Sequence, residues 1–380
     1  MKKCPVSEYC GGCQYQGIDY EKQLEQKQES VNKLLSCFHD VNPIISCRDP
    51  LHYRNKMQVS FACDEKKRII FGYYVPKTHT VVPVDECMLC EKGISEILSS
   101  VKKILIRHHI PIYDEAMKKG CLRYIQIRSS NQGEYMLILV TASVSLPKAD
   151  LLVRDILKAH PEIRSIIHNV NRKSSSDILG EKNTILYGKG YITDELCGLS
   201  FRISPSSFYQ VNRIQTEVLY NEAIRAAAFK GNEILIDAYC GIGTIGLSAA
   251  KHVKEVIGVE SNASAIRDAQ NNCRINKIAN ARFICEDAGK YMEYLSRNKT
   301  HIDTVIMDPP RGGSDSRFIS SMVKMKPEHI IYISCNPVTL KRDLSDLNRS
   351  YQVDSIQPVD MFPFTKHIEV IAVLSRKKAG

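Results

Sequence analysis

Apolar positions repeat with two different periods along this chain, and the change of period predicts how it divides. A helical repeat runs through residues 19–37, where Asp19 stands in position to cap the helix. Over residues 53–199 the pattern shortens to alternating runs of strand length, interrupted by helical stretches near 91–107 and 149–160. This first half is therefore expected to be a mixed α+β region.

Beyond Gly198 strands and helices alternate, which predicts a parallel sheet with helices on both faces. The expected strands are 233–238, 255–260, 281–285, 304–307, 330–334 and 369–374. We therefore expect an α/β protein in three parts: an amino-terminal segment with one helix (1–50), a central α+β domain (51–197) and a Rossmann-like domain (198–380).

The composition of the 380-residue chain is that of an ordinary globular protein, and its formal net charge is +10. This charge favours a polyanionic partner, although it is equally typical of a soluble basic enzyme. No apolar run approaches the roughly twenty residues that span a bilayer, and no signal-peptide core follows Met1–Pro5. We expect a cytosolic protein without membrane partners, whose 14 cysteines are metal ligands, catalytic groups or core residues.

Five cysteines have the spacing of a metal site. Cys4, Cys10 and Cys13 form C-x5-C-x2-C, and Cys87 and Cys90 form a second C-x2-C. Two C-x2-C pairs together would make a four-thiolate zinc site of the ribbon type. The first three cysteines with one of the later pair would instead hold an iron–sulfur cluster. Spacing alone slightly favours zinc, so both metals stay open at this point.

A glycine-rich turn follows the first strand of the Rossmann-like domain. Residues 237–243, DAYCGIG, lead from the strand into a helix, and the glycines let a ligand approach the backbone closely. Glu260 ends the next strand about twenty residues further on, where a carboxylate can hold the hydroxyls of a ribose. No Gly-Lys-Ser/Thr follows, which disfavours a triphosphate site. The pattern predicts a cofactor that contains a ribose, and a dinucleotide remains among the possibilities.

Three further residues lie where strands of this domain begin or end. Asp308 follows the fourth strand within DPPRGG, and Cys335 follows the fifth within SCNP. Both are expected at the carboxyl edge of the sheet, where ligands collect in open α/β folds. Glu369 begins an apolar strand, so burial should raise its pKa and suit it to act as a general base. Because a strand-end cysteine is more often inert than reactive, the case for chemistry rests on this grouping.

Together these motifs are similar to those of the S-adenosylmethionine-dependent RNA (uracil-5-)-methyltransferases. The resemblance covers nearly the whole chain, and its pieces are SSFYQVN (206–212), DAYCGIG (237–243), GVE (258–260), DPPR (308–311), SCNP (334–337) and residues 360–369. The early cysteines and Cys87 resemble the ligands of the [4Fe–4S] cluster in cluster-bearing members. The resemblance thus implies iron–sulfur, with zinc as the alternative, Cys90 as a spare thiol, and the ligands Cys4, Cys10, Cys13 and Cys87.

The resemblance also implies a thiolate mechanism. Cys335 would add to C6 of uracil, C5 would take the methyl group of S-adenosylmethionine, and Glu369 would then remove the C5 proton. The target uridine must be unpaired or flipped out, because C6 is unreachable inside a duplex. Thr244 departs from the Asn that the family commonly has, so its contact with the cofactor follows less directly. The cofactor or base contacts implied are Gln210, Tyr239, Thr244, Glu260, Asp287 and Asp308.

For the substrate, cluster-bearing members point to large-subunit (23S) ribosomal RNA, with uridine 54 of transfer RNA as the alternative. The implied enzyme is a monomer whose central domain binds RNA. Family members often begin with a small β-barrel RNA-binding domain, for which there is no room before Cys4. Cytosine-5 methylation is disfavoured because its usual Pro-Cys motif is absent. A non-catalytic RNA-binding protein of the same fold is the last alternative, and the pair of Cys335 and Glu369 argues against it.

Overall fold

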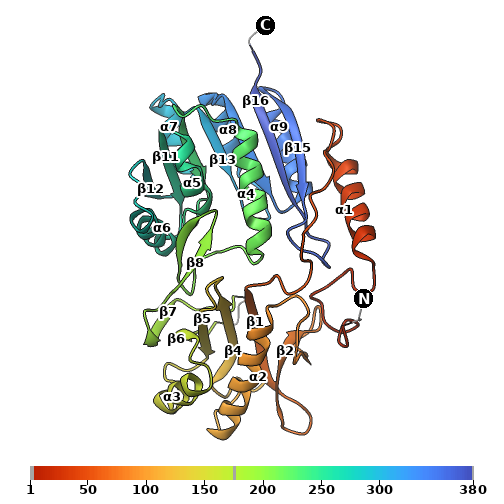
Figure 1. Ribbon diagram of the computed structural model, residues 1–380, viewed down its shortest axis with the longest axis vertical. Coiled ribbons are helices and arrows are strands. Elements are labelled where there is room, and N and C mark those ends of the chain that lie inside the picture. Colours follow the sequence, from red (N-terminus) through yellow and green to blue (C-terminus); the bar gives the residue numbers. More distant parts are fainter. Residues whose placement is uncertain (1–3, 174–176, 379–380) are drawn as a thin grey trace. The chain divides into compact units, whose positions relative to one another are not determined.

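The computed structural model describes residues 4–173 and 177–378 and divides the chain into two compact units (Figure 1). The first unit contains the residues up to Gly17 together with Asp49–Asp194 and Arg202–Ser206. The second contains Ile18–Arg48, Glu195–Phe201 and the residues from Ser207 onward. The expected amino-terminal part (1–50) is thus split, because its helix groups with the second unit. Over the described ranges, no helix is both long and apolar enough to cross a membrane.

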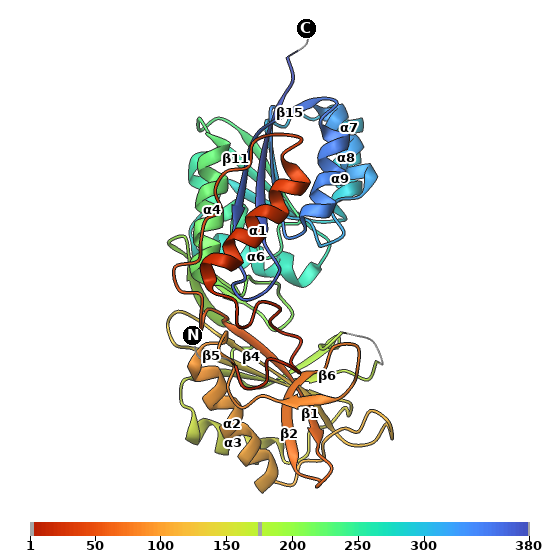
Figure 2. The same cartoon turned by 90° about the vertical axis from the view of Figure 1, so that its right-hand side faces the viewer.

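A seven-stranded sheet forms the first unit, in the order β3-β2-β1-β4-β5-β6-β7. All neighbours are antiparallel except β5 and β6, which are parallel and joined by α3 (Ala149–Ala159). α2 (Lys92–Arg107) and α3 pack on one face over a core of aliphatic side chains (Figure 2). The strands are β1 (Lys56–Cys63), β2 (Ile69–Tyr74), β3 (Val81–Pro83), β4 (Leu122–Ser129), β5 (Tyr135–Thr141), β6 (Ile163–Val170) and β7 (Lys182–Gly188).

A second seven-stranded sheet forms the second unit, in the order β12-β11-β10-β13-β14-β16-β15. The six predicted strands are present, with ends that differ by at most two residues. The first five strands in this order are parallel as expected, but β16 runs antiparallel to β14 and β15 antiparallel to β16. The strands are β10 (Ile234–Ala238), β11 (Glu255–Glu260), β12 (Ala281–Cys285), β13 (Thr304–Met307), β14 (His329–Ser334), β15 (Tyr351–Val359) and β16 (Glu369–Arg376).

Helices cover both faces of the second sheet, as the alternating pattern predicts (Figures 1 and 2). One face packs against α1 (Tyr20–Leu35), α7 (Ala288–Arg297), α8 (Ser316–Met325) and α9 (Pro337–Leu347), which share one hydrophobic core with the strands. The other face carries α4 (Arg213–Ala227), α5 (Thr244–Ala249) and α6 (Ala263–Ile275). Asp19 occupies the cap position of α1, but its side chain makes no capping hydrogen bond. β8 (Ile192–Leu196) and β9 (Leu199–Ile203) pair as a separate two-stranded sheet.

Candidate active site

The carboxyl ends of the parallel strands gather the residues predicted to act in chemistry at one edge of the second sheet. Most of them end or closely follow a parallel strand, and the antiparallel β16 contributes its first residue to the same edge. Strand order reverses between β10 and β13, which is the switch point where ligands bind in open α/β sheets. The set comprises Tyr239, Glu260, Asp287, Asp308, Cys335 and Glu369.

Strand register places Cys335 beside Glu369. Ser334, the last residue of β14, pairs with Val370 of the antiparallel β16. The next residues outward, Cys335 and Glu369, therefore come opposite each other. Because side chains alternate between the faces of a strand and Val370 packs in the core shared with α8 and α9, the pair belongs to the other face, which α4 covers.

Asp308 joins this pair from the neighbouring strand β13. Met307 packs in the core shared with α7–α9, so Asp308 belongs to the same face as Cys335 and Glu369. Its amide donates to the Ala238 carbonyl at 3.4 Å, which holds it beside the end of β10. The negative charges of Asp308 and Glu369 both act on the Cys335 thiol, so the three groups lie within electrostatic reach of one another.

Burial dominates the ionisation of these groups. It is the largest of the effects that raise the pKa of Cys335 to about 11, ahead of the charges of Glu369 and Asp308, while Arg311 lowers it. Burial also raises the pKa of Asp308 to about 7 and lifts that of Glu369 well above its ordinary value. Glu369 is 2% exposed, and its Oε2 atom has no hydrogen-bond partner among the described residues. Burial thus shifts this carboxyl toward its protonated form, and a carboxyl with a pKa raised in this way is suited to exchange a proton with a substrate.

The turn that carries Cys335 is fixed from both sides. Asn336 caps α9 by accepting a hydrogen bond from the Val338 amide at 3.2 Å, and Pro337 takes the first helical position. The side-chain amide of Asn336 also donates to the Arg311 carbonyl at 3.0 Å, which ties this turn to the loop after β13. The thiol thus lies at a helix amino terminus, where the helix dipole favours a thiolate and opposes the effect of burial.

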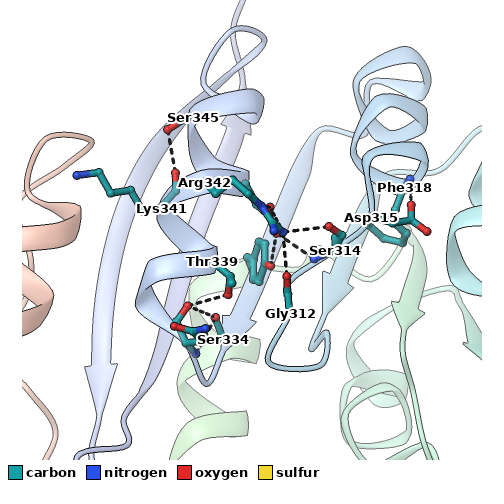
Figure 3. Close-up of polar contacts among 12 residues, drawn as sticks. Gly312, Ser314, Asp315, Phe318, Ser334, Thr339, Lys341, Arg342 and Ser345 are labelled. Carbon is teal, nitrogen blue, oxygen red and sulfur yellow. Dashed lines mark hydrogen bonds and ion pairs between the residues drawn. The ribbon is translucent and has the colours of Figure 1, made fainter.

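Helix α9 also holds the loop that follows Asp308 (Figure 3). Arg342 donates to the carbonyls of Gly312 and Ser314, both at 3.1 Å, and its Nε atom donates to Asp343 at 2.7 Å. The other oxygen of Asp343 accepts the Ser314 amide at 3.0 Å and the Tyr332 hydroxyl at 2.7 Å. Sequence reasoning missed Arg342 and Asp343, because adjacent charged residues on a helix usually mark a solvated surface.

The Ser314 hydroxyl extends this network to the glycine-rich turn, where it lies 3.1 Å from the Tyr239 hydroxyl. Tyr239 has φ 63°, a left-handed conformation that is rare for an aromatic residue, and Gly241 and Gly243 also have positive φ. The Gly241 amide donates to Glu260 Oε2 at 3.3 Å. The turn, the acidic strand end and Tyr239 therefore form one connected site that fits the ribose-containing end of a nucleoside cofactor.

The other residues predicted to contact the cofactor have local partners. Gln210 is buried just before α4. The Thr244 hydroxyl lies 3.0 Å from the hydroxyl of Tyr220 on α4, and Asp287 caps α7 through the Lys290 amide. Their contacts with a cofactor remain predictions.

The segment 360–367, which leads into Glu369, is anchored by α1. Lys27 donates to Asp360 at 2.6 Å and to the Phe362 carbonyl at 3.1 Å, and both charged side chains are buried. The Tyr20 hydroxyl donates to the second Asp360 oxygen at 2.8 Å. Sequence reasoning missed Lys27, because a lysine within an amphipathic helix pattern is expected on the solvent side.

The four predicted metal ligands, Cys4, Cys10, Cys13 and Cys87, all line one cavity of about 70 Å³ in the first unit. Gly11 approaches Pro76 so closely that an added Cβ would lie 2.7 Å from the proline ring, which presses the amino-terminal turn against the β2–β3 connection. Across residues 4–173 and 177–378, however, no three His, Cys, Asp or Glu side chains are grouped as a bound metal ion requires. A metal centre therefore stays a prediction.

Cys90 differs from these four cysteines. It is fully buried, does not line the cavity, and forms a thiol hydrogen bond with Cys87. That hydrogen bond is the largest cause that lowers the pKa of Cys87, to about 6. Whether Cys4 or Cys90 would complete a metal site stays a prediction.

Comparisons with known proteins show which family the chain resembles. The model of the tRNA (Uracil-5-)-methyltransferase family matches residues 166–377. An uncharacterized RNA methyltransferase of Staphylococcus aureus (strain MSSA476) is 41% identical over 380 residues, which cover 98% of this chain and 84% of that protein. Another, from Halalkalibacterium halodurans, is 41% identical over 98% of this chain and 83% of its own length.

A solved structure extends the similarity to nearly the whole chain. Pyrococcus abyssi tRNA (uracil-54, C5)-methyltransferase, in complex with S-adenosyl-L-homocysteine, matches with a TM-score of 0.80 and 30% identity, over 97% of this chain and 86% of that one. The fold is that of an S-adenosylmethionine-dependent methyltransferase, as predicted. The chain therefore belongs to the tRNA (uracil-5-)-methyltransferase family and is an RNA methyltransferase.

Proposed function

We propose that this enzyme methylates C5 of a uridine in RNA, with Cys335 as the nucleophile and Glu369 as the general base. The observation that carries the proposal is the β14–β16 register, which sets the two side chains opposite each other on one face of the sheet. Methylation of C5 requires a nucleophile that adds to the ring and is later expelled, and a base that allows this expulsion. A thiolate and a base on the same face of the sheet could supply both.

Each residue has a defined step. The Cys335 thiolate forms a bond to C6 of uracil, and the displaced electron pair makes C5 nucleophilic. S-adenosylmethionine, when bound, supplies the methyl group that C5 takes. Glu369 then removes the C5 proton, and the returning electron pair breaks the S–C6 bond and regenerates the thiolate.

Asp308, Tyr239 and Glu260 would hold the cofactor, with Glu260 toward the ribose hydroxyls. Gln210, Thr244 and Asp287 complete the predicted contacts, and Arg311 would hold a phosphate or a uracil oxygen. The cofactor carries a positive charge, so its binding beside Asp308 should lower the pKa of the thiol and of both carboxyls. Catalysis would then start from a thiolate that is rare in the free enzyme.

Labelled S-adenosylmethionine and unfractionated RNA test the activity. Wild-type protein should transfer label, and nucleoside mass spectrometry should find it in 5-methyluridine. Cys335→Ala should abolish transfer while cofactor binding persists. Cys285→Ala is the matched control, since Cys285 is an exposed thiol at the end of β12 in the same unit. Turnover by Cys335→Ala, or label in cytidine, would refute the assignment.

For the substrate, we propose 23S ribosomal RNA, on the strength of the C-x5-C-x2-C motif with Cys87. The 30% identical Pyrococcus abyssi enzyme acts on uracil 54 of tRNA, which keeps tRNA as the second candidate. Transcripts of both RNAs should be offered in competition. A product confined to tRNA would overturn the ribosomal proposal while leaving the methylation chemistry intact.

We further propose that the four cavity-lining thiols bind a [4Fe–4S] cluster, which holds the amino-terminal turn against the first unit and shapes its RNA surface. The ligand set supports this, because thiolates are the usual ligands of such clusters. Anaerobically purified protein should be brown and contain iron and sulfide. Zinc in their place would select the alternative. If cluster-free protein kept its fold and its RNA affinity, the proposed role would be wrong.

A further inference from the structure

The first unit contains a second cavity, of about 730 Å³, that the proposed chemistry leaves unexplained. Its lining includes Gln58 and Ser60 of β1, and Met57 and Phe61, which flank these residues in the strand, pack in the core shared with α2 and α3. The cavity therefore opens on the face opposite α2 and α3, which none of the helices described for this unit covers. Its volume lies in the range of small-ligand sites, about 300–1,000 Å³. The side chains that give it chemical character are Tyr74, His79, Tyr113, Glu115, Arg123 and Tyr124.

A carboxylate fixes several of these side chains. Glu115 Oε1 accepts hydrogen bonds from the hydroxyls of Tyr74 and Tyr124, at 3.3 and 3.2 Å, and from Arg123 at 3.4 Å. Glu115 Oε2 lies 2.8 Å from Nδ1 of His79. The ring of His79 packs edge-on against Tyr74, with centroids 5.5 Å apart. The aromatic groups are thus held in place before any ligand arrives, which reduces the entropy lost on binding.

Arg123 supplies a cation that is fixed between aromatic rings. Its guanidinium carbon lies 5.1 Å from the ring centroids of both Tyr113 and Tyr124. Its Nη1 atom donates to the carbonyls of Asn171 and Lys173, at 3.0 and 2.9 Å. Because the Arg123 side chain is only 6% exposed, it supplies positive charge behind the rings, and the half-buried rings of Tyr74 and Tyr113 are left for a flat, electron-rich group to stack on.

We infer that this cavity binds an unpaired nucleotide of the RNA substrate, whose base stacks on Tyr74 and Tyr113 beside the charge of Arg123. Single-stranded RNA is recognised mainly by unstacked bases that lie on aromatic side chains or guanidinium planes. Lys118, which is exposed and also lines the cavity, would meet a phosphate. Every lining residue belongs to the first unit, whereas Cys335 and Glu369 belong to the second, so the cavity shares no residue with the proposed catalytic pair. The inference rests on the RNA substrate of the enzyme and not on the roles of Cys335 and Glu369.

The chain contains no tryptophan, so one introduced tryptophan reports on the cavity alone. In Tyr113→Trp, short oligouridylate or oligoadenylate should quench the fluorescence in a saturable manner, and base-free polyphosphate should not. Tyr187→Trp is the control, since Tyr187 lies on β7 of the same unit, outside the cavity and 41% exposed. If the oligonucleotides do not quench the fluorescence, or if polyphosphate quenches it equally, the proposal that a base stacks in this cavity would be wrong.

A binding measurement gives the second test. Tyr113→Ala should weaken the affinity for unfractionated RNA roughly tenfold, which is the scale of one lost base–aromatic stack. Tyr113→Ala should also raise KM for RNA, while kcat and the affinity for the cofactor stay near wild type. The control Tyr187→Ala should change neither the RNA affinity nor KM. Unchanged RNA affinity in a folded Tyr113→Ala protein would refute the site. Because binding is read without turnover, this result stays separate from any failure of the proposed catalysis.

Discussion

The Cys335 thiol is subject to opposing electrostatic effects. Burial and two nearby carboxyls favour the protonated form, while Arg311 and the amino terminus of α9 favour the thiolate. Burial and the two carboxyls have the larger effect in the free protein, and they raise the pKa of Cys335 to about 11. In the proposed mechanism the thiol would stay protonated until the positively charged cofactor binds, which would protect it from other electrophiles.

The pH dependence of Cys335 alkylation follows from this balance. Because only thiolate reacts, labelling of Cys335 by iodoacetamide should rise about tenfold per pH unit from pH 7 and level off near the pKa of about 11. Asp308→Asn removes a negative charge, so it should lower this pKa and speed labelling at pH 8 about three- to tenfold. Peptide mass spectrometry follows the site. Slower labelling in Asp308→Asn would contradict the stated cause.

At the scale of single residues, the sequence allowed us to predict residues that lie at strand ends. It did not reveal residues whose role comes from contacts with other helices and loops. Cys335 and Asp308 could be predicted at one edge of the sheet from strand limits alone, whereas Glu369 could be singled out only as an acid that begins an apolar strand. Lys27, Arg342 and Asp343 could not be predicted, since their roles depend on partners on other elements. Nothing in the local pattern distinguishes them from surface charges.

At the scale of elements, α1 and the segment 360–367 are joined by a buried ion pair. Lys27→Met would leave Asp360 charged and buried without its cation, which should cost about 3–5 kcal/mol of unfolding free energy. Urea denaturation measures the loss. Arg297→Met, which breaks the exposed pair with Glu293 on α7, is the control and should change little. A shift no larger than that of the control would show that the pair does not anchor this segment.

Helix α9 provides a second test at this scale. Arg342→Gln removes the bonds to Gly312 and Ser314, so the loop after Asp308 should open more often. Hydrogen exchange of peptides that cover 311–315 should accelerate, while β14 stays protected. Lys341→Gln on the same helix is the control. Equal exchange in both variants would place the restraint elsewhere in the loop.

Among the elements of the second sheet, the strands with continuous apolar runs were predictable from the sequence. The edge strand β15 was not. β15 alternates apolar residues with Gln352 and Asp354 and contains a bulge between Val353 and Ser355, which hides its period. The antiparallel direction of β16 was likewise invisible, because direction depends on pairing and not on composition. That direction is what brings Glu369 opposite Cys335.

At the scale of the molecule, the net charge of +10 predicts strongly salt-dependent RNA binding. If the aromatic cavity acts by stacking, Tyr113→Ala should lower affinity at every salt concentration without changing the slope of log affinity against log salt. Lys118→Ala should reduce the slope by about 0.7, the value for one phosphate contact on a single strand. Salt titrations of both variants check this, and a changed slope in Tyr113→Ala would point to an electrostatic role instead.

The most direct test of the account is to stop the reaction after the Cys335 bond to RNA has formed. If Glu369 is the base, as proposed, Glu369→Gln should leave the C5 proton in place and block elimination, so that a methylated protein–RNA adduct accumulates on a denaturing gel. Mass spectrometry should place the adduct on Cys335, and the double variant with Cys335→Ala should form none. A Glu369→Gln protein that binds RNA and cofactor but forms no adduct, or that turns over like wild type, would contradict the pairing of Cys335 and Glu369.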